Sequence, residues 1–240
     1  MTSRVAAVLA LALTAASCAA QAQTRAPHAG GWYRVAQSLG LVDAPEARAR
    51  HQWEHLASAD GAACRAALRA AGVRFTSLPD RERPDARGCG IPHPVIVTRG
   101  PTGMRWEGVR VDCSFALTLP AVERVIQEEA HARLHTAVRA VGTLGSYNCR
   151  PVRGGVTLSE HALGNAVDVA RFTLARGRAV SVARDYPSGV REPDARGGFL
   201  LAVQSRLREE AGFSRLRGPD TDALHRDHFH LDRAPSWWRW

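Results

Sequence analysis

The chain has 240 residues, a formal net charge of +9 and a hydrophobic content of 45%. This length and composition are typical of a globular protein with a buried core, and they exclude a fully disordered chain. No apolar run reaches the ~18 residues of a membrane-spanning helix. All 32 basic residues are Arg and are spread along the sequence. We therefore interpret the charge as a solvated surface and expect no nucleic-acid partner.

Residues 1–22 predict an export signal. Arg4 precedes a 12-residue apolar run over residues 5–16, and small residues follow. Residues 20–22 (AQA) have the form of an ordinary signal cleavage site. Residues 15–18 (AASC) instead resemble a lipobox, in which Cys18 is lipidated and anchors the protein to a membrane. Both patterns predict an exported protein of the periplasm or cell envelope.

The cysteine content agrees with export. Cys18 is cleaved off or acylated under either signal pattern, which leaves four cysteines, an even number typical of disulfides in an oxidising compartment. They are Cys64, Cys89, Cys113 and Cys149. Their spacings are too wide for a C-x-x-C zinc or redox motif. Proximity along the sequence favours the pairs Cys64–Cys89 and Cys113–Cys149.

The rest of the chain divides into a linker with an N-terminal helical extension, residues 23–59, and one domain over residues 60–240. Helices are predicted over residues 60–71, 118–134 and 199–211 by apolar periodicity and by Gly at the helix ends. Alternating apolar residues predict strands over 95–98, 104–113, 138–144, 166–173, 179–182, 213–216 and 228–232. We expect an α+β fold, with an antiparallel sheet of about four to six strands and helices packed on one side.

The chemistry-bearing residues gather in two segments. His225, His228 and His230 lie within six positions, and His161 lies seven residues before Asp168. A catalytic zinc site takes three His or carboxylate ligands and leaves one position for water. His161, Asp168 and His230 would supply that set.

Strand alternation supports a metal site at Asp168. Val167 and Val169 point to the opposite face and can enter the core, so Asp168 faces away from it. Gly164 and Ala166 are small, which would let the backbone pass close to a metal ion. The Asp168 carboxylate is therefore expected to face an open cleft.

The same alternation applies to the second segment. His228 and His230 would share one face of a strand, while Phe229 and Leu231 point to the core. One imidazole could then bind a metal while the other contacts a metal-bound water or a substrate oxygen.

The segments GSYNCRPV, LSEHALGNAVDVARF and HRDHFHLD resemble the bacterial extensin-like C-terminal domain family, over roughly residues 60–233. The wider pattern, S-x-H-x-x-G-x-A-x-D followed about 60 residues later by H-x-H, is similar to zinc peptidases that cleave peptidoglycan stems. These are the D-Ala-D-Ala carboxypeptidases, murein endopeptidases and lysostaphin-like enzymes, to which the hedgehog N-domain is related. The resemblance implies an exported peptidase with one zinc ion in a cleft of the sheet and a peptidoglycan peptide as substrate.

By position, the resemblance implies zinc ligation by His161, Asp168 and His230, with His228 as a catalytic residue beside the metal. His225 matches a further active-site His of the murein endopeptidases. Asp227 falls where the carboxypeptidases have an acidic base. A regular strand would turn Asp227 away from the metal, which favours His228 as the base, whereas a bulge before the strand would favour Asp227.

Two further residues each have two interpretations. Arg150 resembles the Arg that orients substrate in these enzymes, or it is a surface Arg beside a disulfide. Ser159 either hydrogen-bonds Asp168 or caps a turn.

The bond that is cleaved stays open between a carboxypeptidase and an endopeptidase specificity. The alternative function is a non-catalytic, zinc-containing module that binds the cell wall. The presence of both ligands and candidate bases argues against a pure binding role.

Overall fold

The structure is a computed structural model and describes residues 45–187 and 192–234. The predicted export signal, with Cys18, lies outside these residues. Within them, no helix has the length and apolar character needed to cross a membrane.

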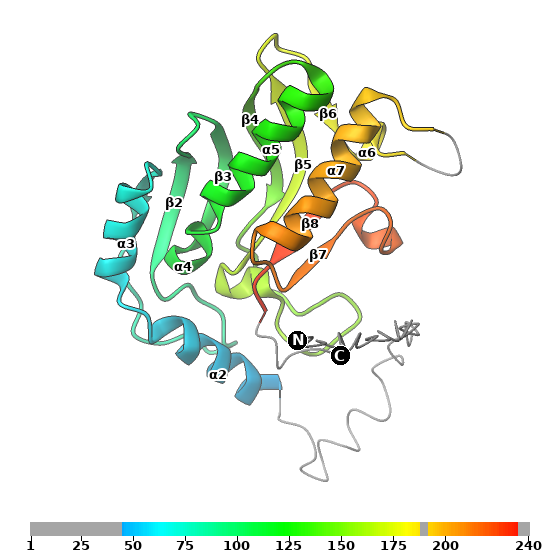
Figure 1. The fold of residues 1–240 in the computed structure, drawn as a ribbon. Coiled ribbons are helices and arrows are strands. Elements are labelled where there is room, and N and C mark those ends of the chain that lie inside the picture. Colours follow the sequence, from blue (N-terminus) through cyan, green and yellow to red (C-terminus); the bar gives the residue numbers. More distant parts are fainter. Residues whose placement is uncertain (1–44, 188–191, 235–240) are drawn as a thin grey trace, which may run out of the picture.

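One sheet of eight strands runs through the described part of the molecule (Figure 1). Its order is β1-β2-β3-β4-β5-β8-β7, and β6 pairs with β5. The strands are β1 Arg74–Ser77, β2 Pro94–Arg99, β3 Arg105–Asp112, β4 Val138–Gly145, β5 Ala166–Leu174, β6 Ala179–Ser181, β7 Arg215–Arg217 and β8 Phe229–Asp232. The α+β class is confirmed, but the expected strand number of four to six is too low.

The sheet is mixed rather than purely antiparallel, because β3 and β4 pair in parallel. Helices α4, Cys113–Ala116, and α5, Leu119–Leu134, connect these two strands and return the chain to the same end of the sheet. Parallel neighbours require such a crossover. Sequence alternation missed β1, because this short edge strand is mostly exposed and has no apolar face.

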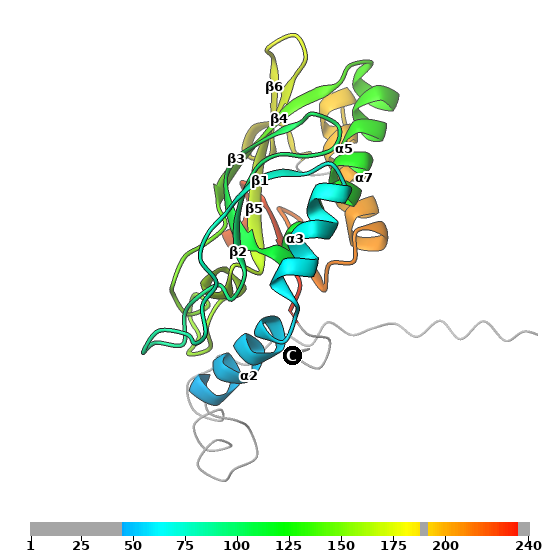
Figure 2. The same ribbon diagram turned by 90° about the vertical axis from the view of Figure 1, so that its left-hand side faces the viewer.

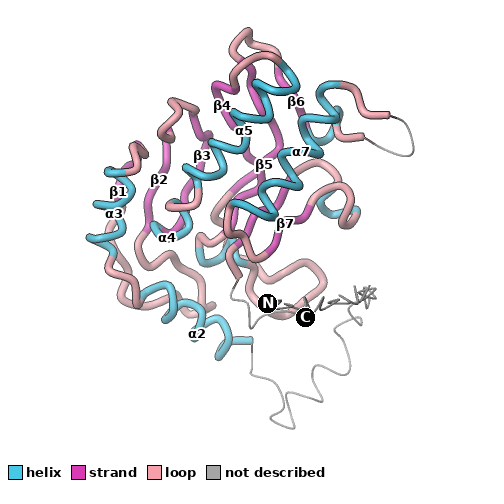
Figure 3. The backbone as a smooth tube through the Cα atoms, in the orientation of Figure 1, coloured by secondary structure: helices cyan, strands magenta, loops and turns pink. Residues whose placement is uncertain are grey.

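The remaining helices are α2 Pro45–Ala57, α3 Gly61–Ala70, α6 Val182–Asp185 and α7 Ala195–Glu210, with the short 3₁₀ helices η1 Glu160–Leu163 and η2 Ala223–His225. The long helices α5 and α7 lie side by side on one face of the sheet (Figures 2 and 3). Helix α7 starts before the predicted residue 199, because the Asp194 side chain accepts hydrogen bonds from the amides of Arg196 and Gly197.

The main core fills the space between the sheet and these helices. Alternate residues of β5 and β8 point into this core, where they pack against side chains of α5 and α7. The buried side chains include Val167, Val169, Phe229 and Leu231 of the strands and Val122, Ile126, Phe199 and Val203 of the helices. The residues between them on β5 and β8 therefore face the opposite side of the sheet.

The four cysteines form two disulfides, as predicted, but the predicted pairing is wrong. The bonds join Cys64 to Cys113 and Cys89 to Cys149. Strands β2 and β3 form an antiparallel hairpin that places Pro94 opposite Asp112, so the chain returns toward α3 at Cys113. Proximity along the sequence could not predict that the hairpin brings Cys113 back to Cys64.

The Cys89–Cys149 bond lies beside η1. On the Cys89 side, the Gly90 amide donates a hydrogen bond to the Ala162 carbonyl at 3.0 Å, and on the other side the Asn148 amide donates to the His161 carbonyl at 3.1 Å. The disulfide thus joins two segments that both contact the turn carrying His161.

We predict that peptide mapping will show this pairing, because each cysteine lies on its own tryptic peptide. Without reduction, peptide 51–65 should be linked to 111–124, and peptide 88–99 to 140–153. Replacing Cys89 and Cys149 together by Ala should lower the unfolding free energy by about 2–5 kcal/mol in chemical denaturation. A linked pair of peptides 51–65 and 88–99 would contradict the structure.

Candidate metal centre

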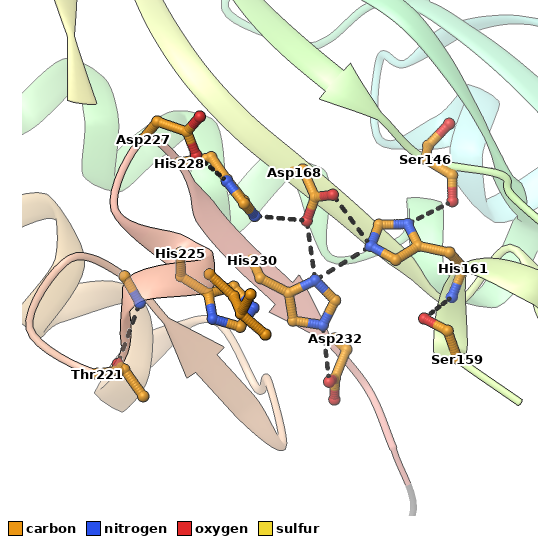
Figure 4. A network of polar contacts seen from close by, with 12 residues as sticks. Ser146, Ser159, His161, Asp168, Thr221, His225, Asp227, His228, His230 and Asp232 are labelled. Atoms are coloured by element: carbon orange, nitrogen blue, oxygen red, sulfur yellow. Dashed lines mark hydrogen bonds and ion pairs between the residues drawn. The ribbon is translucent and has the colours of Figure 1, made fainter. Parts of the chain in front are cut away.

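A cavity of about 220 Å³ opens on the sheet face opposite the long helices. Its walls come from residues 150–161, from β5, β7 and β8, and from η2 with the residues that follow it. Three candidate ligands, His161, Asp168 and His230, lie together at this cavity (Figure 4).

The donor atoms of these three residues face one another. His161 Nε2 lies 3.1 Å from His230 Nδ1 and 3.2 Å from Asp168 Oδ2, and His230 Nδ1 lies 2.8 Å from Asp168 Oδ1. Donors of a tetrahedral zinc site, with bonds of about 2.0 Å, are separated by about 3.3 Å. The spacing and chemistry of the set therefore fit a zinc ion.

The sheet register brings two of the ligands together. Asp168 of β5 and His230 of β8 are direct antiparallel partners, flanked by the partners Val167 with Leu231 and Val169 with Phe229. Partner side chains on one face of a sheet lie within about 5 Å of each other. Burial of the flanking pairs thus fixes which face the ligands occupy.

The third ligand, His161, comes from η1, which ends at Gly164. This glycine has a φ of 66°, and a Cβ there would lie 2.6 Å from the side chain of Ile91. Gly164 is therefore needed for close packing of the turn against the residues before β2. This packing role adds to the predicted role of Gly164, to let the backbone approach a metal, which stays a prediction.

The other ring nitrogen of each histidine ligand is held by an oxygen. His161 Nδ1 donates to the Ser146 carbonyl at 2.9 Å, and His230 Nε2 donates to Asp232 at 3.0 Å. These contacts direct His161 Nε2 and His230 Nδ1 toward each other and toward Asp168, where each can bind a cation when it carries no proton. Such supporting hydrogen bonds are typical of histidines that ligate metals.

A cation bound by this set would compete with a proton. Burial by itself raises the pKa of Asp168, but hydrogen bonds from His161 and His230 outweigh it and lower that pKa. Burial by itself lowers the pKa of His230, but Asp168 and Asp232 outweigh it and raise that pKa to about 9. Metal binding would therefore displace a proton from His230.

His228 lies directly beside the ligands. Its Nε2 is 3.5 Å from Asp168 Oδ1, and its Nδ1 is 2.8 Å from Asp227 Oδ1. Figure 4 shows Asp227 on the far side of His228 from Asp168. The Asp227 side chain is outside the cavity lining formed by the described residues.

The other predicted site residues also lie at or near the cavity. His225 lines it, and its Nδ1 is held by Asp222 at 2.7 Å. Arg150 lines it with an exposed side chain that donates to the carbonyl of the next residue. Ser159 accepts a hydrogen bond from the His161 amide at 3.4 Å, so its hydroxyl caps η1.

Sequence reasoning missed two residues that support the ligands. Asp232 lies two positions after His230, so strand alternation alone would have placed it on the ligand face. Ser146 acts through its backbone carbonyl, which any residue type would supply, and no sequence signal marks it.

A third missed feature is a buried polar cluster behind η1. Glu160 accepts hydrogen bonds from Gln52 of α2 and from Asn165. Burial is the main cause that raises the pKa of Glu160 to about 7. Beside this cluster, Trp53 and Leu56 of α2 pack with Leu163 of η1. Helix α2 therefore supports the turn that carries His161.

Comparison with known sequences decides the family. A family model described as "Extensin-like protein C-terminus" matches residues 62–239. The chain belongs to this family. The matched region of this extensin-like chain includes both disulfides and all three candidate ligands and begins after α2. No curated protein and no solved structure gives a significant match.

We predict that the ligand set will hold one metal ion per chain. His161→Ala, Asp168→Asn and His230→Ala should each reduce bound zinc from one equivalent to near zero, as measured by elemental analysis of the purified protein. His228→Ala should retain zinc, because His228 lies outside the ligand set. Unchanged zinc in the His161 and His230 variants would contradict the assignment.

Glu160 should make the stability of the metal-free protein depend on pH. Burial raises the pKa of Glu160 to about 7 in the folded protein, from 4.5 for a free Glu, so the folded protein keeps the carboxyl proton up to about pH 7. Its stabilising contribution is therefore complete below about pH 4.5 and is lost as the pH rises through 7. Glu160→Gln cannot titrate, so its unfolding free energy relative to the natural protein should rise from pH 5 to pH 8.5 by on the order of 2–3 kcal/mol.

Urea denaturation in the presence of a chelator measures this difference. A Glu160→Gln effect that is the same at both pH values would show that Glu160 is ionised in the folded protein.

Proposed function

We propose that the protein is an exported zinc-dependent peptidase that hydrolyses peptide bonds of peptidoglycan stems or cross-links. The observation that carries the proposal is the position of His228 Nε2 beside Asp168, at the edge of a complete ligand set in an open cavity. A zinc ion bound by His161, Asp168 and His230 would supply Lewis acidity for the attack of water on a carbonyl.

His228 has the geometry of a general base. Asp227 accepts the hydrogen bond from His228 Nδ1, so that in the neutral ring Nε2 carries no proton and is directed toward the ligands. Neutral His228 can take a proton from the attacking water and return it to the leaving amine. In this arrangement Asp227 orients His228, as a carboxylate orients the base of other hydrolases.

His225 and Arg150 would act on the substrate. The His225 ring lies 5.2 Å from the His228 ring and 5.6 Å from the His230 ring, measured between centroids. Its bond to Asp222 directs the other ring nitrogen away from that carboxylate. In the neutral ring that nitrogen carries no proton, so His225 can accept a hydrogen bond from a substrate N–H, and Arg150 can hold a carboxylate or carbonyl at the cavity edge.

The choice of peptidoglycan as substrate rests on location and resemblance. The two disulfides support an oxidising compartment, and together with the export signal pattern they support our proposal of the periplasm or cell envelope. The motif pattern resembles that of peptidoglycan peptidases. Cys18 would add a lipid anchor if the lipobox pattern operates.

The direct test is mass spectrometry of purified muropeptides after incubation with the protein. We expect loss of stem residues or separation of cross-linked peptides, and we expect a chelator to abolish both. Retention of the protein on peptidoglycan without any cleavage would favour the non-catalytic binding module instead.

Rate constants of variants test the base. His228→Gln should lower the rate by about 10²–10⁴-fold, and Asp227→Asn should have a smaller effect because it changes only the orientation of His228. His131→Gln, an exposed residue of α5, serves as the control and should leave the rate unchanged. A larger loss for Asp227→Asn than for His228→Gln would make Asp227 the base.

A further inference from the structure

Arginines outnumber carboxylates in the lining of the cavity. Four arginines line it, two on the loop after β4, Arg150 and Arg153, and two on β7, Arg215 and Arg217. Three carboxylates also line the cavity, and each has a hydrogen-bond partner within the site. These are Glu160, Asp168 and Asp232. The arginines are therefore the groups of the cavity that can pair with an anionic ligand.

The β7 arginines are held in defined positions by the sheet. Leu216 between them is buried in the core, so both arginines point to the cavity face. In the antiparallel register, Arg215 lies opposite Asp232 and Arg217 lies opposite His230. A guanidinium thus stands one strand away from a candidate metal ligand.

The two arginines differ in their partners. Arg215 Nε lies 3.9 Å from Asp232 Oδ1, which associates this side chain with the carboxylate that supports His230. Within the described residues, the half-buried guanidinium of Arg217 has neither an ion pair nor a hydrogen bond. Arg217 is therefore the arginine of β7 that is available to a substrate.

The two arginines of the opposite wall are less well positioned to bind a substrate group. Arg150 and Arg153 are exposed, and Arg150 already donates to the Pro151 carbonyl. Arg217 is half-buried on a strand that pairs with β8, and less conformational freedom is lost when such a side chain binds a ligand. A carboxylate is the substrate group that matches a guanidinium, through two parallel charged hydrogen bonds.

We propose that Arg217 binds a free carboxylate of the substrate and that the substrate is an acidic peptide. Neighbouring strands lie about 4.8 Å apart, and an extended peptide spans about 3.3–3.6 Å per residue. The carboxylate would therefore lie within about one or two residues of the bond that is cleaved. This inference rests on the proposed peptidase function, and it makes Arg217 a specificity-determining residue.

The test uses one muropeptide preparation in two forms, with its carboxylates free or converted to amides by ammonia and a carbodiimide. Affinity for each form is measured by calorimetry on metal-free protein, so that a carboxylate cannot bind the metal directly. We expect the natural protein to bind the free acids about 10- to 100-fold more tightly than the amides. In Arg217→Gln this preference should disappear, and in Arg217→Lys part of it should remain.

The control is Arg74→Gln, which removes an exposed arginine from the edge strand β1 at the other end of the sheet. It should keep the full preference, and the melting temperatures of all variants show that they are folded. Equal affinity of the natural protein for both forms would overturn the inference, as would a full preference in Arg217→Gln. A preference that depends on Arg217 without any cleavage by the zinc-loaded protein would support the inference and contradict the peptidase function.

Discussion

The site depends on one cross-strand pair, Asp168 of β5 opposite His230 of β8. The apolar partners on either side of this pair are buried against α5 and α7, so a shift of one residue in the register would expose them. The free energy of core burial therefore also fixes the direction of the two ligands. This coupling places a polar ligand pair on the open face of a sheet without a dedicated loop.

The rest of the structure brings His161 to that pair and keeps it there. The Cys89–Cys149 bond joins two segments that contact η1, and Gly164 lets the turn pack closely against Ile91. Behind the turn, Glu160 is held by Gln52 of α2. Because α2 precedes the family match at residue 62, the metal centre draws support from outside the shared family region.

The sequence was informative where a periodic pattern reports directly on burial. Alternation in AVDVA and HFHL gave strands β5 and β8 and the faces of Asp168 and His230, as the structure has them. The disulfide pairing and the parallel β3–β4 contact depend on how distant segments meet, which local patterns do not encode. The same limit applies to Ser146 and Gln52, whose roles come from contacts with η1 and its flanking residues.

Anomalous diffraction at the zinc absorption edge, from crystals of the zinc-loaded protein, tests the central claim most directly. The account predicts one strong peak per chain, within bonding distance of His161 Nε2, the Asp168 carboxylate and His230 Nδ1. His230 Nε2 should remain hydrogen-bonded to Asp232. A zinc ion bound through His230 Nε2, or a strong peak away from these three residues, would contradict the account.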